Sequence, residues 1–140
     1  MKRTPADEAL LALARLAMDA SVRAADDLGG LSPVQLRALT ALRRANGANL
    51  ATLAEEMGVT VSTASRLVDR LVAAEWVHRR PSPDSRREIS LTLTAAGKAL
   101  LRHFDDRRVL RLRECLDRLA VDRQEAVVEA LAEFAAVVHP

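Results

Sequence analysis

Two short apolar patterns separated by a glycine limit the folds open to this chain more than any other feature of its sequence. Apolar residues recur at i, i+3, i+4 and i+7 within residues 50–57 and again within residues 64–71. This spacing is typical of helices with one buried face. Gly58 ends the first pattern and Thr60 is a candidate N-cap for the second. The sequence therefore predicts a helix-turn-helix.

Longer helical patterns flank this pair on both sides. One covers residues 5–28 and stops at two glycines, another begins at Ser32, and two more cover residues 94–119 and 122–138. Each of the outer patterns has an apolar stripe. A chain with this order of elements is predicted to be mostly helical.

A strand-like region follows the helix pair. Residues 76–80 and 88–93 have strand character, and the second run alternates apolar and hydroxyl side chains. Residues 81–85 between them contain two prolines and an aspartate, which favours a rigid hairpin loop. The predicted fold class is therefore mostly α with a small β-hairpin, with a winged helix-turn-helix region in residues 32–93.

Composition is that of a globular protein. Hydrophobic residues make up 49% of the chain and charged residues 29%, with a net charge of only +2. The single cysteine cannot form an internal disulfide, and neither a signal peptide nor a membrane-length apolar run is found. We expect one cytoplasmic domain over residues 1–140, with no membrane contact.

Enzymatic chemistry finds little support in the sequence. The three histidines, His78, His103 and His139, are far apart, and no glycine-rich phosphate loop is present. Cys115 has no histidine or cysteine at ligand spacing, so we expect no metal site and no cofactor. Leucines flank Cys115 and predict a buried structural thiol, with a redox-sensing thiol as the alternative.

The second helix of the pair has a polar face opposite its apolar stripe. Ser62, Arg66 and Asp69 point away from that stripe on a helical wheel. Short side chains allow a helix to enter the major groove of DNA, and an arginine can form two hydrogen bonds with guanine. The candidate DNA-contacting residues of this helix are Thr60, Ser62, Thr63, Ser65, Arg66 and Arg70. The alternative is an ordinary amphipathic surface helix.

Positive charge is concentrated in the predicted hairpin, because residues 78–87 contain four arginines and a single acidic residue. Arg79, Arg80 and Arg87 are candidates for phosphate contacts. Arg86, near the tip, is a candidate for the minor groove. Asp84 is two residues earlier and is predicted to hold the Arg86 guanidinium. A solvated, charged hairpin tip is the alternative.

Four segments together resemble the MarR family of regulators: residues 53–60, 62–71, 79–87 and 93–97. The resemblance implies a homodimer that binds a pseudo-palindromic duplex, regulated repression and a small-molecule effector of unspecified identity. The chain departs from the family at two points. Glu75 stands where glycine is usual, which predicts an altered helix end. One extra residue before Leu93 predicts a bulge in the second strand.

The terminal helices of residues 5–28 and 94–138 are predicted to form the dimerisation platform. Their apolar stripes present more surface than the winged helix-turn-helix region of residues 32–93 can cover. The candidate interface residues are Leu10, Leu13, Ala17, Val127, Leu131 and Phe134. Two alternatives remain: a winged-helix protein-interaction module without DNA binding, and a metal- or thiol-regulated sensor. Steep salt dependence of duplex binding distinguishes the first from a DNA-binding regulator.

Overall fold

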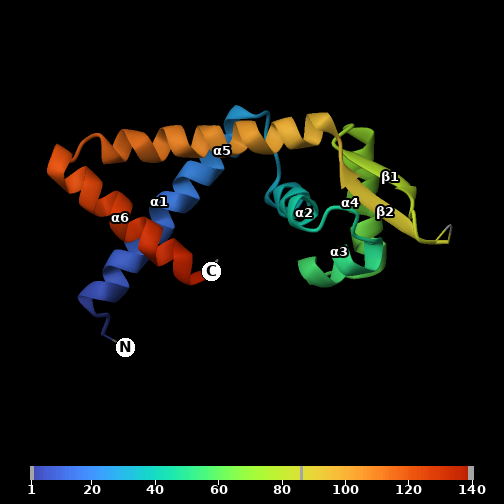
Figure 1. The fold of residues 1–140 in the computed structure, drawn as a ribbon, viewed down its shortest axis with the longest axis horizontal. Coiled ribbons are helices and arrows are strands. Elements are labelled where there is room, and N and C mark those ends of the chain that lie inside the picture. The colour runs from blue at the N-terminus through green and yellow to red at the C-terminus, as the bar shows by residue number, and fades with distance from the viewer. Residues whose placement is uncertain (1, 86, 139–140) are drawn as a thin grey trace. The chain divides into compact units, whose positions relative to one another are not determined.

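The computed structural model describes residues 2–85 and 87–138. Within them the chain forms six helices and one antiparallel hairpin, which confirms the predicted mostly helical fold (Figure 1). None of the helices in these described residues is long and apolar enough to cross a membrane. The elements are α1 (Pro5–Asp27), α2 (Pro33–Arg44), α3 (Leu50–Met57), α4 (Val61–Ala73), β1 (Val77–Pro81), β2 (Ile89–Leu93), α5 (Ala95–Leu116) and α6 (Val121–Val138).

The chain is divided into two compact units. The first unit contains the described residues up to Arg23 and from Asp106 onward. It therefore contains most of α1, the second half of α5 and all of α6. The second unit, Ala24–Asp105, contains α2, α3, α4, the hairpin and the first half of α5. The division falls within α1 and within α5, so each of these helices contributes residues to both units.

Side-chain caps determine where the short helices of the second unit begin. The N–H of Thr52 donates to Asn49 Oδ1 at 2.8 Å, and the N–H of Thr63 donates to Thr60 Oγ1 at 3.2 Å. Such bonds satisfy N–H groups that have no partner within the first turn. Gly58 ends α3 with φ +66°, in the left-handed region. These observations confirm the predicted helix-turn-helix boundaries.

The core of the second unit joins one face of each helix to one face of the hairpin. The α4 residues that the apolar spacing predicted, Ala64, Leu67, Val68 and Leu71, are all buried. They lie in the same core as buried residues from the other elements, which include Leu39, Leu42, Leu53, Val77, Leu91 and Leu101. Burial of this face fixes which side of α4 remains exposed.

The hairpin has a regular register. Val77 pairs with Leu93 and Pro81 with Ile89, so both strands begin one residue later than predicted and the predicted bulge in the second strand is wrong. The extra residue is instead accommodated in the loop, where the N–H of Ser82 donates to the Glu88 carbonyl at 2.7 Å. On the other edge of β2, the N–H of Leu91 donates to the Ala48 carbonyl at 2.9 Å.

The predicted end of the long helix at Leu119 is also wrong. α5 ends at Leu116, and the N–H of Leu119 then donates to the Leu116 carbonyl at 3.0 Å in a tight turn. α6 begins at Val121, one residue earlier than predicted. The turn satisfies a carbonyl that the end of α5 leaves free, so the chain reverses over a few residues.

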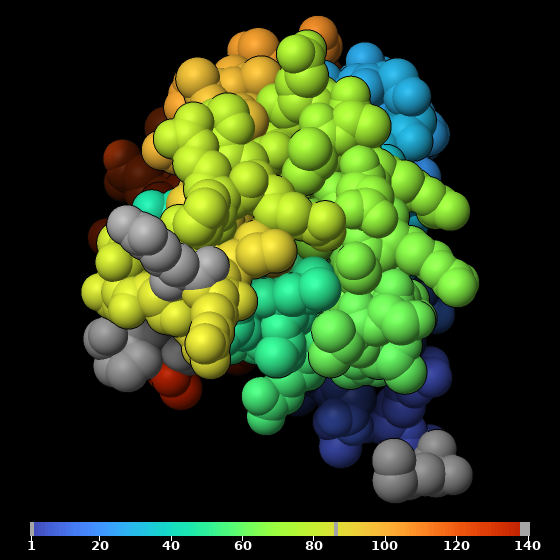
Figure 2. Space-filling model, turned by 90° about the vertical axis from the view of Figure 1, so that its right-hand side faces the viewer, coloured from blue at the N-terminus to red at the C-terminus, as the bar shows by residue number. Residues whose placement is uncertain are grey.

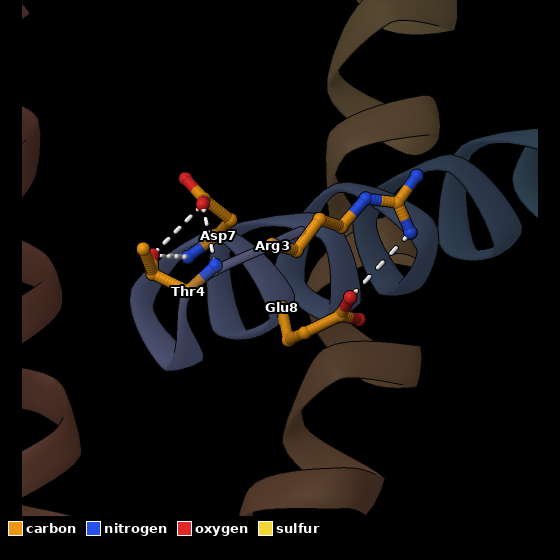
Figure 3. A network of polar contacts seen from close by, with 4 residues as sticks. All are labelled: Arg3, Thr4, Asp7 and Glu8. Carbon is orange, nitrogen blue, oxygen red and sulfur yellow. Dashed lines mark hydrogen bonds and ion pairs between the residues drawn. The ribbon is translucent and has the colours of Figure 1, made fainter. Parts of the chain in front are cut away.

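The start of α1 is held by a reciprocal cap between Thr4 and Asp7 (Figure 3). The backbone N–H and the hydroxyl of Thr4 each donate to Asp7 Oδ2 at 2.8 Å, and the N–H of Asp7 donates to Thr4 Oγ1 at 3.2 Å. The bond from the Thr4 backbone, followed by that from its hydroxyl, lowers the pKa of Asp7. The contribution of this cap is therefore present near neutral pH and is lost as the pH falls through that lowered pKa.

Glu75 follows α4 with φ +62°, the left-handed conformation that normally favours glycine. Its N–H donates to the Val72 carbonyl at 2.9 Å, and its carbonyl accepts a bond from the Thr94 hydroxyl at 2.6 Å. The expectation of an altered helix end is therefore wrong. The chain keeps the turn and accepts a strained residue within it.

We predict that Glu75→Gly raises the free energy of unfolding by about 0.5–1 kcal/mol, because glycine adopts positive φ without a steric cost. Urea denaturation monitored by circular dichroism measures the change. Ala74→Gly is the matched control: φ at Ala74 is −78°, so glycine there should destabilise by roughly 0.5–1 kcal/mol. Shifts of the same sign in both variants would contradict this explanation.

Candidate nucleic-acid interface

α4 exposes a polar face of small residues and arginines. Ser62, Arg66 and Arg70 are exposed, and Ser65 is half-buried beside the core. Thr60 and Thr63 are exposed too. Thr60 also caps the helix, because its Oγ1 accepts from the N–H of Thr63, and its hydroxyl donates to Thr63 Oγ1 at 2.9 Å. The six predicted residues of this helix therefore lie together along its exposed side and at its N-terminus.

The hairpin lies beside α4 on the same unit, and Figure 2 shows both on one face, α4 in green and the hairpin in yellow-green to yellow. Successive residues of a strand point to opposite sides. Val77 is buried and Arg79 lies on the same side of β1, although Arg79 is itself exposed, whereas Arg80 lies on the opposite side. The two neighbouring arginines of β1 thus have different surroundings.

Arg79, on the same side of β1 as Val77, forms an ion pair with α4. Its Nη1 lies 3.0 Å from Asp69 Oδ1, and its side chain is 31% exposed. The sequence analysis placed Asp69 on the exposed face of α4 but missed this contact. The signal that could have found it is the parity of β1, because Arg79 is two residues from the apolar Val77.

The other arginines of the hairpin (the wing, residues 77–93) do not share the environment of Arg79. Arg80 and Arg87 are exposed, and neither forms an ion pair within the described part of the chain. Asp84 is exposed in the loop, where its N–H donates to Ser82 Oγ at 3.3 Å. Arg86 lies outside the described residues, and with it the predicted Asp84–Arg86 contact.

Basic residues on α2 are mostly neutralised. Arg43 pairs with Asp105 at 2.7 Å and Arg44 with Glu56 at 3.4 Å. Arg37 donates to the Met57 carbonyl at the end of α3, at 3.1 Å. On the face formed by α4 and the hairpin, positive charge without an ion pair among the described residues is carried by Arg66, Arg70, Arg80 and Arg87, and it can attract phosphates. Lys98 and Arg102 of α5 are also exposed without an ion pair in the described part of the chain.

The first unit has a different character, because its surface carries large apolar side chains. Leu10, Leu13, Leu131 and Phe134 are 36–54% exposed, whereas Ala17 and Val127 are half-buried within one chain. Side chains of α1, α5 and α6 also line an open apolar groove of about 410 Å³. Exposed apolar surface of this extent is typical of a surface that binds a partner.

Cys115 lines this groove and is exposed, so the prediction of a buried thiol is wrong. The neighbouring leucines that suggested burial are themselves only partly covered, with Leu112 and Leu116 half-buried and Leu119 43% exposed. Among the described residues, no group of three or more histidine, cysteine, aspartate or glutamate side chains could hold a metal ion.

Comparison with known proteins gives a consistent result. The sequence model of the MarR family matches residues 31–89, from the start of α2 to the wing. The crystal structure of RV1404 from Mycobacterium tuberculosis has a TM-score of 0.82 and 31% identity, and the alignment covers all of this chain and 98% of that one.

Two further relatives extend the comparison. YfiV, an uncharacterised HTH-type transcriptional regulator of Bacillus subtilis, is 29% identical over 102 residues, which are 73% of this chain but only 64% of YfiV. A point mutant of MepR from Staphylococcus aureus, solved bound to an oligodeoxyribonucleotide, has a TM-score of 0.75 at 15% identity. That alignment covers 98% of this chain and the whole of MepR, and it shows a shared fold.

We predict that Leu67→Ala lowers the free energy of unfolding by roughly 2–5 kcal/mol, because it removes a buried side chain that holds α4 on the core. Leu67 is only 8% exposed. Val61→Ala, at a 51% exposed position of the same helix, is the control and should change stability by less than about 0.5 kcal/mol. An unchanged denaturation midpoint for Leu67→Ala would mean that α4 packs through another face.

Proposed function

This chain belongs to the MarR family, and from that membership we propose that it is a transcriptional regulator that binds duplex DNA as a homodimer. The proposal concerns sequence-specific binding to a pseudo-palindromic operator, without enzymatic activity. Repression, response to a small-molecule effector and a cytoplasmic location are part of the proposal and rest on the family alone.

The observation that carries the proposal is the exposed face of α4 together with the outer side of the hairpin. Arg66 is exposed one turn into α4 and has no ion pair among the described residues. An arginine in that place can donate two hydrogen bonds to guanine O6 and N7 in the major groove. The small side chains of Ser62 and Thr63 let the start of the helix approach the bases.

The hairpin supplies contacts that do not depend on sequence. Arg80 and Arg87 are exposed and lack acidic partners among the described residues, so each is free to neutralise a phosphate. Release of the counterions bound to those phosphates makes affinity fall with salt concentration. The MepR mutant was solved with an oligodeoxyribonucleotide bound to the same fold, which supports DNA as the partner.

The apolar surface of the first unit supports a homodimer. A two-fold assembly would cover the exposed side chains of α1 and α6 and would fill the groove that α5 lines. A two-fold dimer would also present two α4 helices related by symmetry, as needed to bind two half-sites about 34 Å apart on one side of a duplex. A symmetric dimer therefore explains both the surface and the expected operator symmetry.

Selection of DNA from a random duplex pool with the purified protein tests the proposed function. We expect an enriched, two-fold symmetric sequence and an affinity that falls steeply between about 50 and 200 mM salt, on the order of what several phosphate contacts produce. Absence of any enriched sequence, together with salt-insensitive behaviour, would favour a winged-helix protein-interaction module.

We predict that Arg66→Ala weakens binding to the enriched duplex by about 1–3 kcal/mol and relaxes preference at one base pair in each half-site. Repeating the selection with the variant shows the base preference position by position. Arg80→Ala is the matched control, because loss of a phosphate contact should weaken all duplexes alike and lower the salt slope by about 1. The base-reading role is wrong if every preference survives in Arg66→Ala.

We predict that the protein is a dimer at micromolar concentration and that Phe134→Asp converts it to a monomer, because a charge would be buried without a partner in the interface. Phe134 is 54% exposed in one chain. Light scattering measures the mass. Val34→Asp, a change of the same kind at a 48% exposed position of α2, should leave the dimer intact. A monomeric wild-type protein would refute this assembly.

A further inference from the structure

We propose that Asp69 is a positioning residue that fixes the hairpin against α4 through its ion pair with Arg79. In this arrangement Arg79 keeps its carboxylate partner in the DNA complex and neutralises no phosphate. The inference deepens the proposed function, and it rests on that function for its effect on DNA selectivity. The pair itself is a property of the free protein and can be tested without DNA.

The placement of Arg79 follows from the register of the hairpin. Val77 and Arg79 lie on the same side of β1, and Arg79 pairs across the hairpin with Leu91. Val77 is 2% and Leu91 0% exposed, so this side of the hairpin faces the core. The aliphatic part of the Arg79 side chain therefore extends from the core side, and its guanidinium reaches the α4 carboxylate.

The ion pair is a second point of attachment between hairpin and helix. Val77 anchors the start of β1 in the core, and Arg79 is two residues further along, about 7 Å at the usual rise of a strand. The paired strand β2 is itself held in the core by Leu91, whose N–H donates to the Ala48 carbonyl, so the hairpin is already attached on its β2 side. The Asp69–Arg79 contact adds an attachment of β1 to α4 beyond Val77, and it limits how far this side of the hairpin can move from α4.

The charge of Asp69 also favours its pairing with Arg79. Asp69 is exposed on the helix that we propose enters DNA, where a free carboxylate would repel phosphates. Paired with Arg79 it adds no net charge to this surface. Arg80, one residue further and on the outer side, has no such partner among the described residues. The two adjacent arginines are therefore expected to differ in role, and each is the natural control for the other.

Amide hydrogen exchange of the free protein tests the attachment directly. We expect Asp69→Asn and Arg79→Gln each to speed exchange in the hairpin by roughly two- to five-fold, the range of an exposed ion pair, while exchange in α2 stays unchanged. Arg80→Gln should leave hairpin exchange as in the wild type. Equal acceleration in Arg80→Gln, or none in Asp69→Asn, would overturn the proposed attachment.

DNA binding tests the second half of the inference, with a duplex enriched by the wild-type protein and a shuffled duplex of the same composition as probes. The double variant Asp69→Asn/Arg79→Gln removes a neutral pair. We expect it to keep the wild-type salt slope but to lose roughly two- to five-fold in preference for the enriched duplex. Arg80→Gln should lower the slope by about 1 and weaken both duplexes equally.

A fall of about 1 in the slope of the double variant would show that Arg79 leaves Asp69 for a phosphate, and would overturn the inference. Unchanged preference would overturn it as well. If the wild-type protein enriches no duplex, the proposed function fails, while the exchange comparison still decides whether the ion pair holds the hairpin. The two failures are therefore distinguishable.

Discussion

The contact between Gly97 and the Trp76 backbone is the constraint on which the rest of the second unit depends. A Cβ atom at Gly97 would lie 2.2 Å from the Trp76 carbonyl oxygen, so only glycine allows α5 to start there. The N–H of Thr94 donates to that same oxygen at 3.0 Å, and the N–H of Gly97 donates to Thr94 Oγ1 at 2.9 Å. The turn after α4, the end of β2 and the start of α5 therefore form one hydrogen-bonded junction. This junction fixes where the hairpin begins relative to the exposed face of α4.

Local features of the sequence were sufficient to predict the two short helices and where they begin, although the end of α5 at Leu116 was missed. Asn49 and Thr60 cap helices within three residues of themselves, and the buried face of α4 follows from spacing alone. The Asp69–Arg79 contact could not be predicted in this way, because it joins two elements whose relative placement depends on the whole core. Because side chains alternate between the two sides of a strand, assigning Val77 to the core nevertheless predicts that Arg79 and Arg80 lie on opposite sides of β1.

Cys115 illustrates a second limit of sequence patterns. An apolar stripe indicates that a helix face is buried, but it does not indicate whether the same chain or a second chain covers that face. Cys115 lies on such a stripe and is exposed within one chain, beside a groove lined by Leu13, Leu116 and Leu131. The same ambiguity affects Phe134, which has the pattern of a core residue and the exposure of a surface residue. The proposed assembly with a second copy would resolve both cases.

The exposed apolar side chains of α1 and α6 have a consequence for how such a regulator responds to its own abundance. If two chains must join before DNA is bound, the concentration of the active species rises as the square of the chain concentration while most chains are single. Operator occupancy then changes more steeply than synthesis does. A modest change in expression would then produce a larger change in operator occupancy without any ligand. The strength of dimerisation through the hydrophobic surface would set the chain concentration at which this change occurs.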